Sequence, residues 1–222
     1  MVDRSAVGSR LRQGASRLGP LGWTALVLVV AVGATVLFQA TRGEPAGTGG
    51  GSTVRVGVSD GDWIPGYVVT SRAELEHLTG ADVYALVSFD TYLSPDGVAM
   101  VLGSSAVIRP AVAYARVPLP RRQTEIVRLA AQRVPQDLAA AMDAVAARSD
   151  APAEAAAYRT HCACVYALVV HGRPEALRDL AARASVRVVD PAPEVADLAS
   201  AVFVAPLPEQ ADRVAPPPDD GG

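Results

Sequence analysis

The sequence predicts an α+β protein in which an N-terminal transmembrane helix precedes one folded domain. Three observations lead to this prediction. Residues 21–40 are a run of twenty mostly apolar residues. The word VYALV occurs twice, starting at Val83 and again at Val165. After each copy come the signals of a helix start and then a second strand candidate, so the domain contains two strand–helix–strand units.

Composition and charge favour a domain with a substantial core and disfavour nucleic-acid binding. The chain has 222 residues, 50% of them hydrophobic, which is ample for one domain. Residues 1–42 hold five Arg against one Asp, whereas residues 43–222 hold 15 Arg against 22 acidic residues. An acidic domain without a basic tract is poorly suited to neutralising phosphates. We therefore expect no nucleic-acid partner.

The apolar run 21–40 has the length of a membrane-spanning helix, because twenty residues at about 1.5 Å each cover a ~30 Å hydrocarbon core. Trp23 lies where an interfacial aromatic residue is expected. A cleaved signal peptide is disfavoured, since cleavage after Ala40 would put Phe38 at the −3 position. Four arginines precede the run: Arg4, Arg10, Arg12 and Arg17. The positive-inside rule thus predicts a single-pass cell-membrane protein with a cytoplasmic N-terminus and an extracytoplasmic domain.

This anchor divides the chain into five expected parts. Residues 1–20 form a basic cytoplasmic N-terminus, and residues 21–40 cross the lipid bilayer. Residues 41–53 are rich in Gly and small polar residues, which is typical of a flexible linker. The folded α+β domain spans 54–205. The Pro-rich, acidic end at 206–222 predicts a disordered tail.

The two repeated units predict a ferredoxin-like βαββαβ order. In each unit a strand, a helix and a second strand follow one another, at 82–90, 94–104 and 106–118 and again at 164–172, 173–185 and 185–191. Ser94 suits the N-cap of the first helix. In this fold the VYALV strands are central, and the other two strands lie at the sheet edges. These other strands carry residues that discourage pairing with foreign chains: Arg109, Pro110, Arg116, Arg187 and Pro191.

The remaining segments add an insert and flanking elements. The insert covers about 119–161, with helices expected at 135–150 and 151–161. Periodicity does not separate strand from helix at 121–134, and we favour a strand for 124–131. Outside the repeat, strands are expected within 53–63 and 200–206. A short helix is expected at 71–78, where Ser71 and Glu74 have capping-box spacing.

The stretch THCACVYALVVH contains the strongest candidate for chemistry, formed by His161, Cys162 and Cys164. Thiolate and imidazole can bind zinc or copper, but a structural zinc site needs four ligands. A Cys nucleophile activated by His161 is disfavoured, because neighbouring residues on a strand point to opposite faces. We therefore predict no metal site and no catalytic residue.

A disulfide is the other outcome for Cys162 and Cys164, since cysteines outside the membrane tend to be oxidised. Alternate strand residues have Cα atoms about 7 Å apart, which is too far for a bridge. The pair would therefore need a bend before the strand begins at Val165. An intermolecular bridge and two half-buried thiols remain open alternatives.

No further motif predicts a reaction. Asp60 and Asp62 flank Gly61 and fit a turn better than a calcium loop. The sequence contains no GxSxG, HExxH, phosphate-loop or GxGxxG motif. We expect no cofactor and no enzymatic activity.

Two stretches, VRVGVSDGDWIPGYVVTSRAELEHL (54–78) and YRTHCACVYALVVHG with VRVVDPAPEV (158–195), resemble uncharacterised single-pass membrane-anchored proteins of GC-rich actinobacteria. This resemblance covers most of the chain beyond the anchor. It implies the same membrane localisation and brings no activity, cofactor or site residue.

The function expected from these features is that of a non-catalytic interaction or regulatory module of the cell envelope, with a protein partner outside the membrane. The insert at 119–161 is the expected partner-facing element, because it departs from the repeat, and the sheet edges come second. One alternative is a thiol-redox or metal-handling protein that uses His161, Cys162 and Cys164. Another is an inhibitor or assembly chaperone of a secreted enzyme.

Overall fold

The computed structural model describes residues 53–103, 107–119 and 124–215. The predicted N-terminus 1–20, the transmembrane span 21–40 and the linker up to residue 52 lie outside these ranges. Among the described residues, no helix is both long and apolar enough to cross a membrane.

The described residues form an α+β fold with five α-helices, seven strands and one short 3₁₀ helix. In chain order the elements are β1 (Val54–Gly57), α2 (Ile64–His77), β2 (Val83–Leu93), α3 (Pro95–Leu102), β3 (Arg109–Ala115), β4 (Val127–Ala130), α4 (Gln136–Arg148), α5 (Pro152–Arg159), β5 (Val165–Gly172), α6 (Pro174–Ala181), β6 (Val186–Ala192), η1 (Leu198–Ser200) and β7 (Ala201–Val204).

Five strands form an antiparallel sheet in the order β4-β3-β5-β2-β6. The two VYALV strands, β2 and β5, are neighbours in its centre, as the sequence predicted. β6 forms one edge, also as predicted. The prediction that β3 forms the other edge is wrong, because the insert supplies β4, which pairs with β3 from Val112↔Ala130 to Ala115↔Val127.

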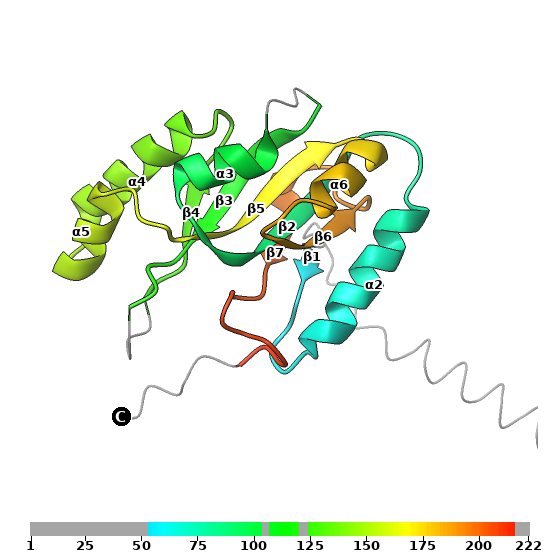
Figure 1. The fold of residues 1–222 in the computed structure, drawn as a ribbon, viewed down its shortest axis with the longest axis horizontal. Helices are drawn as coiled ribbons and strands as arrows, with labels where there is room; N and C mark the ends of the chain where they lie inside the picture. Colours follow the sequence, from blue (N-terminus) through cyan, green and yellow to red (C-terminus); the bar gives the residue numbers. More distant parts are fainter. Residues whose placement is uncertain (1–52, 104–106, 120–123, 216–222) are drawn as a thin grey trace, which may run out of the picture. The chain divides into compact units, whose positions relative to one another are not determined.

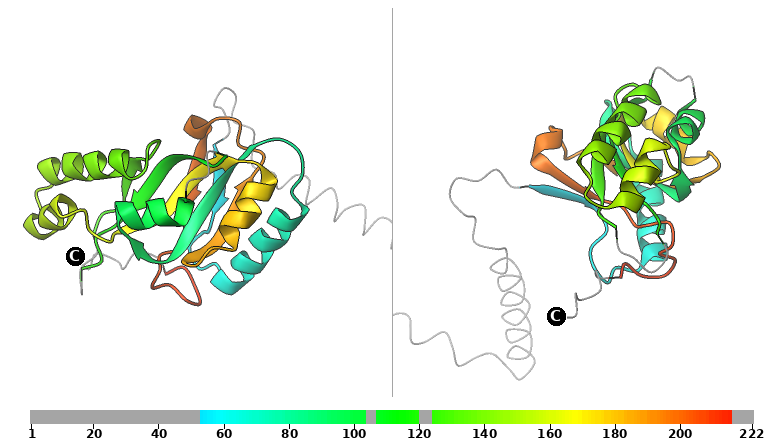
Figure 2. Two further views of the ribbon diagram at one scale, coloured as in Figure 1. Left: turned by 45° about the horizontal axis from the view of Figure 1, so that its top comes forward. Right: turned by 90° about the vertical axis from the view of Figure 1, so that its left-hand side faces the viewer.

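Two layers cover the sheet (Figures 1 and 2). Helices α3 and α6 lie on one face, and the parallel pair β1–β7 lies on the opposite face. The alternation of side chains along β2 matches these layers. Val87 and Phe89 are fully buried in the core on the helix side, whereas Leu86 is fully buried in a second core with Phe203 of β7.

Both helices of the repeat begin where the sequence predicts. The Ser94 hydroxyl accepts a hydrogen bond from the Gly97 amide at 3.1 Å, and Pro95 occupies the first turn of α3. Helix α6 begins at Pro174 and buries Leu177 and Leu180. The Ser94 cap and the two first-turn prolines are encoded locally, which explains why the sequence alone reveals these helix starts.

Helix α2 corrects the prediction for 71–78. It begins at Ile64, with Pro65 in its first turn, so Ser71 is a buried residue in the middle of the helix and does not cap it. Gly66 and the β-branched residues that follow have low helix propensity and hide this early start. Burial of Ile64 and Leu75 outweighs that local preference.

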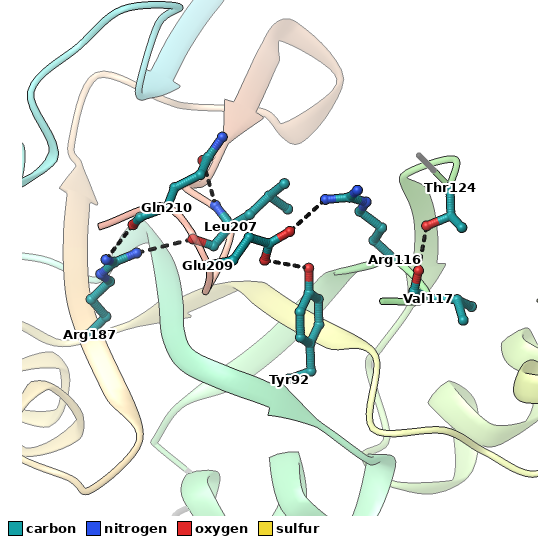
Figure 3. Close-up of polar contacts among 8 residues, drawn as sticks. All are labelled: Tyr92, Arg116, Val117, Thr124, Arg187, Leu207, Glu209 and Gln210. Atoms are coloured by element: carbon teal, nitrogen blue, oxygen red, sulfur yellow. Dashed lines mark hydrogen bonds and ion pairs between the residues drawn. The ribbon is translucent and has the colours of Figure 1, made fainter. Parts of the chain in front are cut away.

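The other expected elements of the insert and flanks are present. The segment 124–131 is a strand at 127–130, and both helices of the insert form as α4 and α5. The expected disorder of 206–222 does not extend to residues 206–215, which make specific contacts with the domain (Figure 3). Residues 216–222 lie outside the described ranges.

Candidate functional site

The predicted thiol cluster lies on a bend between α5 and β5. Cys162 and Cys164 are joined by a disulfide with Cα atoms 5.3 Å apart. This distance is short because residues 161–164 precede β5 and are not extended, and His161 adopts a left-handed conformation with φ of 51°. The amide of Cys162 donates to Ala157 O of α5, and the amide of Cys164 donates to Leu93 O of β2. The bend therefore connects the insert to the central sheet.

His161 does not contact a metal-binding set. Its Nε2 lies 3.1 Å from Asp143 Oδ1 of α4, and its side chain is 41% exposed. Across residues 53–103, 107–119 and 124–215, no group of three or more His, Cys, Asp or Glu side chains could hold a metal ion. The bend therefore has the geometry of a local covalent link.

The C-terminal segment 205–214 contacts the sheet face opposite the helices (Figure 3). Arg187 of β6 donates to two carbonyls of this segment, Leu207 O at 3.2 Å and Gln210 O at 2.6 Å. Glu209 accepts from Arg116 Nη1 and from the Tyr92 hydroxyl, each at 2.8 Å. These contacts hold the segment against β2, the end of β3 and β6.

The same contacts place an aromatic cluster under the segment. The rings of Tyr92 and Tyr166 pack edge to face, with centroids 6.3 Å apart. Burial, followed by the hydrogen bond to Glu209, raises the pKa of Tyr92 well above its ordinary value. These phenols thus stay neutral at physiological pH, and the cluster serves packing.

The β6 edge contains a buried carboxylate that the sequence did not single out. Asp190 is 7% exposed and accepts a hydrogen bond from the Tyr67 hydroxyl of α2 at 3.0 Å. Burial raises the pKa of Asp190 from 3.8 to about 6, although hydrogen bonds from Tyr67 and Ser71 oppose this shift. Asp190 and Glu74 line a pocket of about 330 Å³ between β1, α2 and the end of β6.

The β4 edge is the open end of the sheet. Among the described residues, the only strand paired with β4 is β3. A pocket of about 570 Å³, which we call the β4 pocket, lies between residues 125–128 and residues 145–158 of the insert. Ile126, directly before β4, is 49% exposed. The β4 pocket therefore combines an unpaired strand edge with an exposed apolar side chain.

One side chain in the β4 pocket stands out. Tyr158 of α5 lines the pocket and is 1% exposed, yet its hydroxyl has no hydrogen-bond partner among the described residues. Burial, then Glu154, then Glu125 raise its pKa to about 12, so the hydroxyl remains a donor. The sequence predicted the helix that contains Tyr158 but did not indicate this residue.

Comparison with known proteins adds no function: no family model, curated protein or solved structure matches the chain. The candidate site is consequently chosen on geometry alone. The bend is a covalent link, and the C-terminal segment makes its polar contacts on the outer sheet face. The β4 pocket is the surface where unsatisfied backbone edge, exposed apolar surface and a buried free donor coincide.

Proposed function

We propose that this chain is a single-pass, membrane-anchored interaction module whose extracytoplasmic domain binds a protein partner without catalysing a reaction. The anchor is argued from the apolar run 21–40 and the arginines before it. The binding role is argued from the β4 pocket, which is built by the insert and lies outside the repeated strand–helix–strand units.

We further propose that the repeated units form a ferredoxin-like βαββαβ scaffold. If the repeat strands β2, β3, β5 and β6 are numbered first to fourth, they lie side by side in the order fourth, first, third, second. Helix α3 follows the first strand and α6 follows the third. This is the antiparallel order expected of that scaffold, on which β4, α4 and α5 are an addition.

Topology can be tested with reporter fusions. An alkaline phosphatase domain fused after residue 53 is expected to be active, because it would be exported past the anchor. The same reporter fused after residue 18 is expected to be inactive in the cytoplasm. Equal activity in both fusions would refute the proposed orientation.

Binding can be tested with a photocrosslinking amino acid placed singly on the native chain in intact cells. We expect position Ile126 to capture one defined protein, because this side chain borders the β4 pocket. Val202 of β7 has a similar exposed fraction, 46%, but lies on another surface and serves as the matched control. Val69 and Met100 are two further exposed apolar positions. Lack of capture from all four positions would contradict an interaction module.

A thiol-redox role is a second candidate, because Cys162 and Cys164 are close enough to form a reversible bridge. Replacing both by Ala is expected to abolish any redox response if this role is correct. An inhibitor or assembly chaperone of a secreted enzyme remains a form of the first proposal. It would be favoured if the protein captured from Ile126 is a secreted hydrolase.

A further inference from the structure

The Tyr158 hydroxyl is a donor without an acceptor. Tyr158 belongs to the main core, and its hydroxyl has almost no surface accessible to water. A buried hydroxyl that makes no hydrogen bond is costly, so a native protein rarely keeps one without a reason. Because Tyr158 lines the β4 pocket, an acceptor that enters the pocket and moves aside the side chains covering the hydroxyl would satisfy it.

The strand edge beside this hydroxyl is also unsatisfied. Among the described residues, hydrogen bonds of the β4 backbone run to β3 and to no other strand. An open edge is a template on which an extended segment can add as a further strand. Its backbone carbonyls would be acceptors of the kind that the Tyr158 hydroxyl lacks.

Charge restricts the side chains of such a segment. Glu154 and Glu125 line the pocket, and both raise the pKa of the Tyr158 hydroxyl. A third carboxylate, Asp150, and two arginines, Arg128 and Arg148, also line the pocket, so acidic side chains outnumber basic ones three to two. A carboxylate brought to Tyr158 would be repelled, whereas a Lys or Arg side chain would find two opposite charges.

We propose that the β4 pocket binds an extended, basic segment of a protein partner, which adds as a strand to β4 and accepts a hydrogen bond from the Tyr158 hydroxyl through a backbone carbonyl. This inference rests on the proposed interaction function and specifies its site and the chemistry of its partner. Specificity comes from the acidic pair, Glu125 and Glu154, and affinity comes from backbone pairing.

The test uses the full chain in lipid nanodiscs and a library of random eight-residue peptides displayed on phage. Selection is expected to enrich peptides that contain Lys or Arg and lack Pro at their centre. Binding of an enriched peptide, made synthetically with a fluorescent label, is then measured by anisotropy. Two peptides are then made, each N-methylated on one of the two alternating sets of backbone nitrogens. Only one set points toward β4 in an added strand, so one peptide is expected to lose binding and the other to keep it.

Two variants separate the proposed contact from a general effect of removing a buried hydroxyl. Tyr158→Phe is expected to weaken peptide binding about three- to tenfold, the loss of one hydrogen bond. Ser88→Ala also removes a buried hydroxyl without a partner, but from central strand β2 and away from the pocket. It is expected to leave the affinity unchanged. Glu125→Gln with Glu154→Gln is expected to remove the preference for basic over acidic peptides.

Several results would overturn the inference. They are enrichment of acidic peptides, no enrichment at all, or equal affinity for Tyr158→Phe and the native chain. The proposed function fails separately. If crosslinking captures a partner from Val69 or Met100 while peptides do not bind, the interaction module stands and the β4 site is wrong. If no position captures a protein, the module itself is wrong.

Discussion

The two edges of the five-stranded sheet differ, because one is covered by a helix and the other is open. At the β6 edge, α2 packs alongside the strand, and Tyr67 and Arg72 bond to Asp190 and to the Arg187 carbonyl (Figure 1). At the β4 edge, α4 and α5 approach but leave a pocket of about 570 Å³. Exposed strand edges promote unwanted pairing, so proteins usually cover them. Because the opposite edge is covered, the open β4 edge is consistent with a surface used for binding.

The covered edge is fixed by several independent links. Leu75 of α2 enters the main core, and Arg178 of α6 donates to Leu75 O at 3.0 Å and Leu78 O at 3.1 Å. The β4 side also enters the main core, through Leu129 of β4 and Leu138 and Met142 of α4. Among the described residues, however, no hydrogen bond joins α4 or α5 to the β4 backbone. Exposed residues at the open edge, such as Ile126, should therefore contribute less to stability than Leu75 at the covered edge.

The largest expected effect tests the stability half of this comparison. Leu75 is 3% exposed, so Leu75→Ala should lower the free energy of unfolding by about 3 kcal/mol through lost burial and a residual cavity. Ile126→Ala at the open edge should change it by less than about 0.5 kcal/mol. Urea denaturation followed by circular dichroism measures both. Similar losses for the two variants would show that the edges are not different in kind.

The second prediction concerns the buried carboxylate at the covered edge. Burial raises the Asp190 pKa from 3.8 to about 6, so the fold favours the protonated form. The stability that this preference adds is fully present below pH 3.8 and is lost as the pH rises through 6. A shift of this size corresponds to about 3 kcal/mol. Asp190→Asn cannot ionise, so its stability relative to the native chain should rise by about that amount between pH 4 and pH 7.

Denaturation midpoints at pH 4, 5, 6 and 7 check this expectation, and a difference independent of pH would disprove it. Tyr67→Phe supplies the matched control. The Tyr67 hydroxyl donates to the carboxylate and lowers the Asp190 pKa, so its removal should move the transition to higher pH. Asp190→Asn and Tyr67→Phe thus shift the pH profile in distinguishable ways.

The sequence predicted what local patterns encode. An almost continuous apolar word such as VYALV suits a strand covered on both faces, and β2 and β5 are such strands. The sequence missed what distant segments create. Asp190 follows an apolar run and resembles an ordinary strand-end residue, and its hydrogen-bond partner Tyr67 lies on α2, more than a hundred residues earlier. The unpaired Tyr158 hydroxyl likewise depends on how α5 meets β4, which no local pattern records.

A smaller effect is expected at the bend between the insert and the sheet. Alkylation of the native, non-reduced chain should leave its intact mass unchanged, and alkylation after reduction should add two alkyl groups. Replacing Cys162 and Cys164 by Ala should cost about 1–2 kcal/mol, because the closed loop is very short. Rapid alkylation before reduction would show free thiols and favour the redox alternative.

The smallest predicted effect is the change in stability when either unpaired buried hydroxyl, that of Tyr158 or that of Ser88, is removed. Tyr158→Phe should leave the free energy of unfolding unchanged or raise it by up to about 1 kcal/mol, since it removes a buried polar group that makes no hydrogen bond. Ser88→Ala should behave in the same way. The two variants would then agree in stability and differ in binding, which is the pattern of a donor kept for a partner. A loss of stability on Tyr158→Phe would instead mean that the hydroxyl is already satisfied within the chain, and the open edge would lose its most specific contact.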